Sequence, residues 1–241
     1  MPHPLLGRSI LLITAHPDDE AFLAGGLAFV NTRRGGRTSL ICATQGERGT
    51  SHLHRPMTAQ QLKVVRRREL IRCCRLKGIR TIRLLKYPDG DLRHHEQGFA
   101  KHVETFIQHL RPEVIVTFGS DGFTGHQDHV ACWRVGRQLA RKHGLPLFLF
   151  TAPPSVRGLM ARWVRHRRAM GRYVRTMHPY ALATVRVPVP PGIKIKILRN
   201  HPSQFDYDNP YAGFPKQAVA LFTRGEYFAQ YYPTKQTRKK K

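Results

Sequence analysis

Acidic side chains are scarce in this chain. Asp and Glu together number 15 against 41 Lys and Arg, so the formal net charge is +26 over 241 residues. A field of this sign favours anionic partners, such as nucleic acid, anionic lipid or a phosphorylated substrate. A basic surface that only keeps the protein in solution is the alternative explanation.

Long apolar runs and a cysteine framework are also missing. No uncharged stretch approaches the roughly 20 apolar residues of a membrane span, which excludes a membrane-spanning class. Residues 1–8 lack the charged start, apolar core and cleavage site of a signal peptide. The spacing of the cysteines excludes a disulfide framework and a cysteine zinc site, and for Cys42 and Cys132 we expect buried free thiols. We therefore expect a cytoplasmic protein and leave open peripheral contact with the inner membrane face.

Strand and helix patterns alternate along the chain. They predict strands at 9–15, 37–43, 79–85, 113–118, 146–150 and 183–188, and helices at about 19–34, 58–77, 95–110, 126–144 and 192–200. This alternation predicts a mostly parallel sheet with helices on both faces, a Rossmann-like three-layer α/β fold. Gly25 and Gly26 are expected to let the first helix pack closely on the sheet.

We expect one domain over residues 1–234, with a helical insertion at 151–182 and a basic, disordered tail at 235–241. Within the insertion, residues 157–175 interleave arginines with Met160, Trp163, Met170 and Tyr173. The pattern is typical of a basic amphipathic helix, which either lies on an anionic membrane or is a solvated helix face.

The most informative stretch is His16–Glu20, directly after the first predicted strand. Open α/β sheets place their chemistry at the carboxyl ends of the strands. An imidazole and three carboxylates within five residues are costly there unless something pairs with them. A divalent metal ion would do so.

A second set of the same residue types follows the predicted strand at 113–118. Glycines mark a tight turn there, and His126, Asp128 and His129 come directly after it. Because His126 and His129 are three residues apart, they share a face in the first turn of a helix. Zinc takes imidazole nitrogens and carboxylate oxygens, and catalytic zinc usually keeps three protein ligands. The two strand ends together therefore predict a metal site.

These motifs resemble those of the PIG-L/LmbE family of zinc-dependent N-deacetylases, which act on N-acetylglucosamine-type groups. The resemblance covers about residues 8 to 205 and rests on His16–Glu20, Gly46–Gly49, Arg66 with Glu69, Pro88–Gly90, Gly125–His129 and His201–Gln204. It implies an LmbE-like fold. Two departures are Gln127, where the family often has proline, and Arg48, which adds charge beside Glu47.

The resemblance also implies a metal centre. His16, Asp19 and His129 would be the ligands of zinc, and iron(II) remains an alternative because His and carboxylate ligands suit both metals. Asp18 would be the general base that takes a proton from the zinc-bound water.

Further residues receive roles from the same resemblance. His126 would act as general acid or as a positive group that faces the tetrahedral intermediate. Asp128 would orient His126 through a hydrogen bond. The expected substrate contacts are Arg66, Asp89 and Glu47.

Structural explanations stand beside some of these roles. Asp18 or Asp19 can cap a helix, and we interpret Glu20 as the first-turn charge that a helix dipole favours. The stretch His201–Gln204 either holds an active-site loop or contacts the substrate.

We therefore expect a metal-dependent hydrolase that removes an acetyl group from an N-acetylglucosamine-type substrate with zinc-activated water. The expected partner is an N-acetylated amino sugar, with anionic or lipid-linked forms and a homo-oligomer left open, and no nucleic acid is expected. One alternative is an amidase on a larger sugar conjugate, which substrate-size preference would distinguish. The other is a non-catalytic protein that binds anionic membranes or nucleic acid, which zinc content would distinguish.

Overall fold

One seven-stranded sheet joins the two halves of the chain. The computed structural model describes residues 2–53, 56–153, 155–156, 158–159 and 182–232. The strands are β1 (Ser9–Thr14), β2 (Arg37–Thr44), β3 (Thr81–Tyr87), β4 (Val114–Thr117), β5 (Leu147–Thr151), β6 (Val185–Pro188) and β7 (Gly225–Tyr231). Their order is β3-β2-β1-β4-β5-β7-β6, parallel from β3 to β5, with β7 antiparallel to both of its neighbours. The predicted mostly parallel sheet is confirmed.

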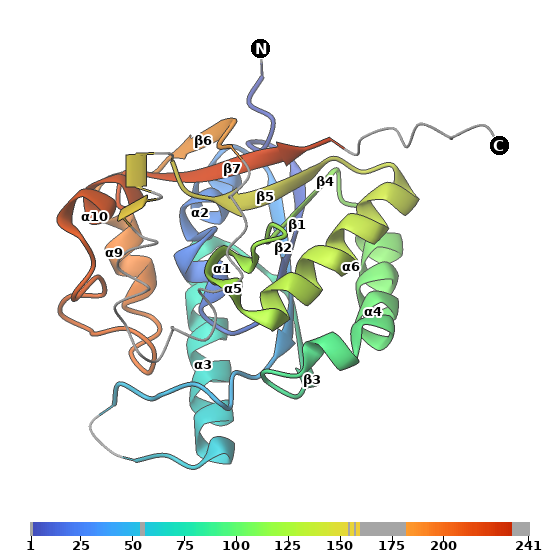
Figure 1. The fold of residues 1–241 in the computed structure, drawn as a ribbon. Helices are drawn as coiled ribbons and strands as arrows, with labels where there is room; N and C mark the ends of the chain where they lie inside the picture. Colours follow the sequence, from blue (N-terminus) through green and yellow to red (C-terminus); the bar gives the residue numbers. More distant parts are fainter. Residues whose placement is uncertain (1, 54–55, 154, 157, 160–181, 233–241) are drawn as a thin grey trace.

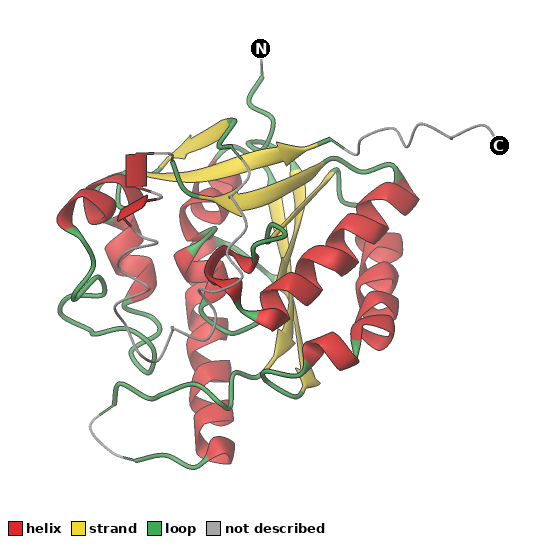
Figure 2. Ribbon diagram, viewed as in Figure 1, coloured by secondary structure: helices red, strands yellow, loops and turns green. Residues whose placement is uncertain are grey.

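Helices cover both faces of this sheet (Figures 1 and 2). On one side lie α4 (Glu96–Leu110) and α6 (Gln127–His143). On the other lie α1 (Asp19–Phe22), α2 (Gly25–Arg33), α3 (Ala59–Lys77) and α9 (Ile193–Leu198). The three-layer α/β architecture that the sequence predicts is therefore present.

The central strands are buried on both faces. The apolar run Ile10–Ile13 of β1 is at most 1% exposed, and every residue of β4 is buried. Parallel strands covered by helices on both sides need such continuous apolar runs, which is why these segments lack polar alternation. The cysteines are buried and free, as expected for Cys42 and Cys132.

The ends of α3 follow the local sequence closely. Thr58 and Gln61 form a reciprocal capping box at its start, and Gly78 ends it in the left-handed conformation at φ 78°. The Ile79 N–H still bonds to the Cys74 carbonyl, so Ile79 belongs to the helix end. For this reason β3 begins at Thr81, two residues later than predicted.

The single helix predicted over 19–34 is wrong, because the structure has two helices there. Glu226 of β7 accepts hydrogen bonds from the Gly26 and Leu27 N–H groups at 2.8 and 2.7 Å, which caps a new helix start. At Gly26 the predicted close packing on the sheet is present, because a Cβ there would lie 3.2 Å from Glu226 of β7. Gly25 instead makes room for Ile197 of α9, which would lie 2.8 Å from a Cβ added there. A Cβ added at Gly26 would lie 2.3 Å from Val189, beyond the end of β6.

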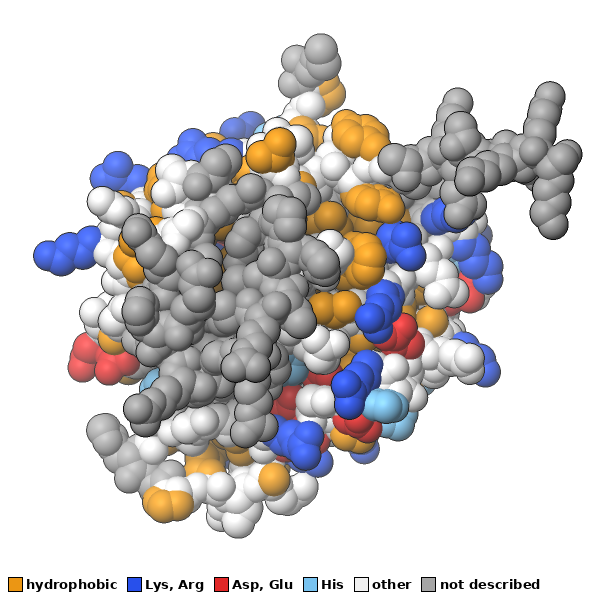
Figure 3. Space-filling model, viewed as in Figure 1, with side chains coloured by type: hydrophobic (Ala, Val, Ile, Leu, Met, Phe, Trp, Pro, Cys, Tyr) orange, Lys and Arg blue, Asp and Glu red, His pale blue; other side chains and the backbone are white. Residues whose placement is uncertain are grey.

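Strand β7 and helix α10 (Lys216–Phe222) were not predicted from the sequence. The helix predicted within 157–175 and the basic tail lie largely or wholly outside the described residues. Within the described part of the chain, no helix combines the length and the apolar character that a bilayer crossing requires. Lys and Arg side chains are spread over the visible surface rather than gathered in one patch (Figure 3).

Candidate metal centre and active site

The two His- and Asp-containing segments lie side by side. Because β1 pairs in parallel with β4, both strands end at the same edge of the sheet. His16 and Asp19 follow β1, whereas His126 and His129 stand at the start of α6, after the short helix α5 (Gly122–Gly125). The His16 ring centroid is 4.6 Å from that of His126 and 5.1 Å from that of His129.

Three side chains converge at this edge. His16 Nδ1 lies 3.2 Å from His129 Nε2, while Asp19 places Oδ1 3.3 Å from His129 Nε2 and Oδ2 3.6 Å from His16 Nδ1. All three residues are less than a tenth exposed. Two imidazole nitrogens and a carboxylate form a donor set that zinc takes. These residues therefore fit the metal ion that the resemblance implies.

Contacts within the protein fix the orientation of these donors. His129 Nδ1 lies 2.8 Å from the Gly122 carbonyl, which only accepts, so Nδ1 carries a proton and Nε2 is the ring nitrogen that faces Asp19 and His16. The His129 ring also stacks on Phe118 at 3.9 Å between centroids. Asp19 Oδ2 accepts hydrogen bonds from the Ala15 and His16 N–H groups. Burial opposes the charge of Asp19, but His129 outweighs it and lowers the Asp19 pKa to about 2.

Asp128 orients His16 in the structure. Its Oδ2 lies 3.3 Å from His16 Nε2, and its two oxygens accept hydrogen bonds from the Gly90 and Leu92 N–H groups. Asp89 Oδ1 is also 3.1 Å from His16 Nε2. Such a carboxylate behind an imidazole aims the opposite ring nitrogen, here Nδ1, at a metal. Burial disfavours protonated His16, but the hydrogen bonds to Asp128 and Asp89 outweigh it and raise the His16 pKa.

His126 is the N-cap of α6, and its Nδ1 accepts the Asp128 backbone N–H at 3.2 Å. The link between His126 and Asp128 thus runs through this backbone group, while the Asp128 carboxylate bonds elsewhere. Burial, followed by the charges of His129 and His16, lowers the His126 pKa to about 3. A neutral ring whose Nδ1 accepts must carry its proton on Nε2, so His126 is a donor at that nitrogen.

Asp18 adopts an unusual backbone conformation, with φ 147°. Its N–H donates to Glu20 Oε2 at 3.0 Å, and its Oδ2 accepts from Arg66 Nη2 at 3.0 Å. The Asp18 side chain is 22% exposed. Burial raises the Asp18 pKa, and Arg66 opposes this rise, leaving a value of about 6. Asp18 is therefore mostly ionised at neutral pH and retains a basic carboxylate.

Arg66 lies behind Asp18 and is 3% exposed. Its guanidinium donates to the carbonyls of Gly46 and Pro17 at 2.8 and 2.7 Å, in addition to Asp18. A Cβ added at Gly46 would lie 2.4 Å from the guanidinium, and one at Gly49 2.5 Å, so these glycines make room for it. The described contacts of Arg66 are thus with the protein itself, in a position that holds Asp18.

Glu47 and Asp89, two other predicted substrate contacts, lie together at the wall of the site. Glu47 Oε1 accepts the Asp89 N–H at 3.2 Å, and Asp89 Oδ2 accepts the Arg48 N–H at 3.0 Å. Glu47 Oε2 is buried without a hydrogen-bond partner in the described part of the chain. Asp89 is 6% exposed, and its Oδ1 lies 3.1 Å from His16 Nε2. It therefore contacts a proposed metal ligand directly.

A buried charge network behind the site was missed by the sequence reasoning. Glu20 is wholly buried, and its Oε1 lies 2.8 Å from Lys77 Nζ and 3.0 Å from His201 Nε2. Glu69 in turn accepts hydrogen bonds from the Ser203 N–H and hydroxyl at 2.9 and 2.6 Å. Glu20 is thus more than a first-turn charge favoured by the helix dipole. It links the Asp18 backbone N–H to two buried cations, Lys77 and His201.

The spacing of ionisable residues along α3 could have indicated this network. Arg66, Glu69, Cys73 and Lys77 recur at intervals of three and four residues, and all four are buried. Ionisable residues at the spacing of a buried helix face indicate partners inside the protein rather than a solvated surface. His201–Gln204 also belongs here: His201 and Ser203 are buried in the network, which supports the structural explanation for them.

Comparisons with known proteins agree with this architecture. Among solved structures, N,N'-diacetylchitobiose deacetylase from Pyrococcus horikoshii has a TM-score of 0.62 and 19% identity, covering 92% of this chain and 83% of that one. A likeness at this identity defines the class by fold alone, an LmbE-like α/β protein. A family model described as PIG-L, GlcNAc-PI de-N-acetylase, matches residues 11–140. The chain therefore belongs to the PIG-L family.

Curated relatives match part of the chain. A 1D-myo-inositol 2-acetamido-2-deoxy-alpha-D-glucopyranoside deacetylase of Salinispora arenicola is 34% identical over 152 residues, 53% of this chain and 49% of that protein. A probable N-acetyl-alpha-D-glucosaminyl L-malate deacetylase 2 of Bacillus subtilis is 35% identical over 137 residues, 55% of this chain and 61% of that protein. The matches thus span about half to three fifths of these relatives' length.

Proposed function

We propose that the protein is a metal-dependent hydrolase that removes the acetyl group from an N-acetylglucosamine-type substrate. The observation that carries the proposal is the convergence of His16, Asp19 and His129, together with the neighbouring Asp18, whose side chain is 22% exposed. The family and the names of its relatives, which are deacetylases of N-acetylated amino sugars, support the same reaction class.

The proposed ligands are His16, Asp19 and His129. A zinc ion bound by them would lower the pKa of a water molecule and polarise the amide carbonyl. Iron(II) suits the same donors. Asp128 and Asp89 hold the His16 ring in place through its Nε2.

Asp18 is the proposed general base. Arg66 holds Oδ2, so Oδ1 is the oxygen proposed to take the proton from the attacking water. The neutral His126 ring is proposed to donate a hydrogen bond from Nε2 to the oxygen of the tetrahedral intermediate, and the proton that Asp18 takes from the water is proposed to pass to the leaving nitrogen. As the water oxygen bonds to the acetyl carbon and the C–N bond breaks, the leaving nitrogen gains a proton, and acetate and a free amine result. Glu47 and Asp89 are proposed to line the substrate side of the site.

The test is metal analysis of protein purified without a histidine tag, combined with free-amine release from N-acetylglucosamine conjugates. We expect about one zinc or iron per chain, the number that a single three-ligand site holds. Amine release should stop with a chelator and return when metal is added back. Protein that binds no metal after reconstitution would contradict the proposal and favour the non-catalytic binding protein.

A further inference from the structure

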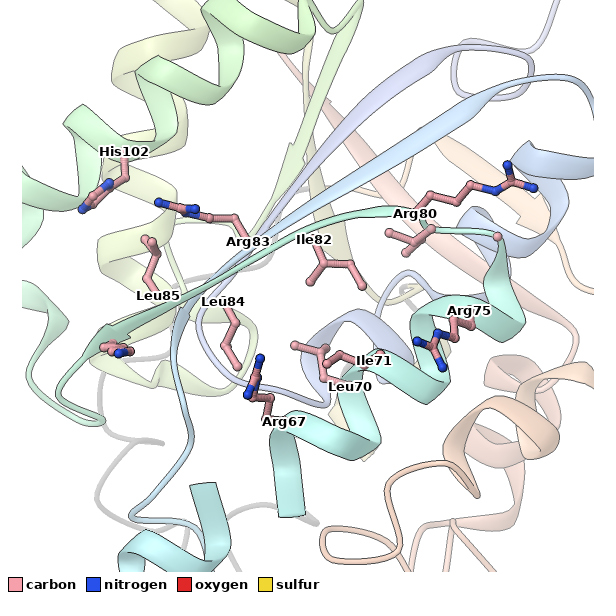
Figure 4. Close-up of a pocket in the computed structure, with 13 residues that line it drawn as sticks. Arg67, Leu70, Ile71, Arg75, Arg80, Ile82, Arg83, Leu84, Leu85 and His102 are labelled. Carbon is pink, nitrogen blue, oxygen red and sulfur yellow. The ribbon is translucent and has the colours of Figure 1, made fainter. Parts of the chain in front are cut away.

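A second feature lies away from the site, at the outer edge of β3. In the described part of the chain β3 pairs only with β2, so it ends the sheet. Such a strand presents a row of backbone N–H and C=O groups without ladder partners. Figure 4 shows α3 on one side of this edge and the helix that carries His102 on the other.

Two adjoining hollows follow this edge. One has a volume of ≈ 980 Å³, and the other, of ≈ 620 Å³, shares Arg67, Ile71, Leu84 and Lys86 with it. Apolar side chains of α3, of β3 and of the turn between them line the larger hollow: Leu70, Ile71, Ile79, Ile82, Leu84 and Leu85. We call the two hollows together the β3 groove.

The β3 groove is cationic. Its lining includes Lys63, Arg67, Arg68, Arg75, Arg80, Arg83 and Lys86, and none of its lining residues is Asp or Glu. Within the described part of the chain, Lys63 alone among these seven forms an ion pair, a 3.9 Å contact with Glu47. The other six cations are exposed and are not neutralised by the protein. Their charge is thus available to an anionic molecule in the groove.

We propose that the β3 groove binds an extended acidic peptide of a partner protein, which adds a strand to β3. A strand edge offers alternating N–H donors and C=O acceptors, and a peptide backbone can form hydrogen bonds with both. A phosphodiester backbone supplies acceptors alone. The apolar floor can take every second side chain of such a strand, and the cations can take its carboxylates.

Two further observations favour a peptide from another protein. The groove lining contains no Phe, Tyr or Trp on which the bases of a single-stranded nucleic acid would stack. A second copy of this chain is a poor occupant, because its own β3 edge carries Arg83 and Lys86 and would oppose like charges. With 15 acidic residues in 241, the chain has little acidic sequence to offer itself.

The test uses a fluorescent peptide of about eight residues that alternates glutamate with valine, a length matched to one strand. Anisotropy with the full protein should show saturable binding that weakens with salt. The same peptide N-methylated at alternate residues keeps its charge but loses backbone donors, so it should bind much more weakly. Arg75→Glu with Arg83→Glu, one change on each side of the groove, should weaken binding about tenfold or more, equivalent to about 1.4 kcal/mol.

Each groove substitution reverses one charge, and the control Arg141→Glu makes the same single reversal at an exposed position of α6, where it should leave the affinity unchanged. Lys86→Glu serves as a second groove variant if the double variant fails to fold. Equal binding of the N-methylated peptide, or equal loss in Arg141→Glu, would overturn strand addition in favour of general charge attraction. Tighter, groove-dependent binding of a single-stranded oligonucleotide or of phosphatidylglycerol vesicles would also overturn it, in favour of those partners.

Discussion

At the scale of single residues, the proposed base Asp18 is the most constrained part of the site. A non-glycine residue at φ 147° costs on the order of 1–3 kcal/mol, and such a conformation persists only when its surroundings enforce it. Glu20 accepts a hydrogen bond from the Asp18 N–H, and Arg66 donates one to the Asp18 carboxylate. These two contacts hold the backbone and the side chain of Asp18 in the strained conformation. The constraint fixes the carboxylate beside the metal donors.

The first prediction concerns this carboxylate. Asp18→Asn keeps the shape and the Arg66 contact but removes the basic oxygen, so we expect kcat to fall about 10² to 10⁴-fold. Metal content should stay unchanged, because Asp18 is not a proposed ligand. Activity and metal analysis of the same sample check both parts. Asp91→Asn, a like change at an exposed carboxylate, is the control, and full activity in Asp18→Asn would refute the role of base.

A second prediction distinguishes the two assignments of Asp128. If Asp128 orients His16, Asp128→Asn should weaken metal affinity about 10- to 100-fold, the usual effect of losing a carboxylate behind a ligating histidine. Competition with a chelator of known affinity measures this change. If Asp128 acts through His126 alone, metal affinity should be unchanged and only turnover should fall.

At the scale of elements, α3 connects the site to the interior. One face of this helix carries Arg66, Glu69 and Lys77, which reach Asp18, Ser203 and Glu20 respectively. Burial opposes the charge of Glu20, but Lys77 outweighs it and lowers the Glu20 pKa. The helix therefore contributes two cations, Arg66 and Lys77, that neutralise the partly exposed Asp18 and the wholly buried Glu20.

Lys77→Met tests the importance of this neutralisation. Methionine fills similar space but leaves Glu20 without its ammonium partner, so we expect the free energy of unfolding to fall by about 3–5 kcal/mol. Denaturant titration of both proteins measures the difference. Arg75→Met, an exposed change in the same helical turn, should have little effect, and equal stability of the two variants would contradict the prediction.

The same network predicts a pH dependence. Burial disfavours the charge of His201, but Glu20 outweighs it and raises the His201 pKa to about 10, above the ordinary value of about 6.5. His201 therefore stabilises the fold fully below about pH 6.5, and this contribution is lost as the pH rises towards 10, at up to about 1.4 kcal/mol per unit.

Unfolding free energies between about pH 7 and 8, where most thiols of the unfolded chain are still protonated, measure this loss. The decline should be smaller in His201→Asn. A variant that loses stability with the same slope as the original protein would show that another group is responsible.

Helix and strand boundaries could be predicted from the sequence where neighbouring residues determine them. Thr58 and Gly78 predicted both ends of α3 because each acts on neighbouring backbone. The break between α1 and α2 was missed because the cap that enforces it, Glu226, is 200 residues distant. The strand that carries Glu226 is antiparallel and mixed in polarity, so it lacks the continuous apolar run of the parallel strands.

The candidate site also has features that the sequence predicts and features that it does not. Its location followed from two strand ends, because parallel neighbours such as β1 and β4 finish at one edge. The partner of Asp128 did not follow, since it depends on how the turn at Gly90 and Leu92 folds against α6. Lys77 was missed because a lone lysine in the last turn of a helix is usually solvated.

At the scale of the whole molecule, charge is the dominant feature. A net +26 on one folded chain creates self-repulsion that opposes the compact state. Raising NaCl from about 0.02 M to about 0.2 M shortens the screening length to less than 10 Å. We therefore expect Tm to rise by a few degrees, as calorimetry can measure. A fall in Tm would mean that attractive surface pairs outweigh the repulsion.

Glu226 has a consequence for how the protein is made. The ribosome releases the chain from its N-terminus, so the segment with His16 and Asp19 emerges long before β7. Until residue 226 is available, the start of α2 has no cap and Lys194 has no anionic partner. The helix that follows the first half of the proposed metal centre thus waits for the last described strand to be synthesised, and folding during translation is completed late rather than stepwise.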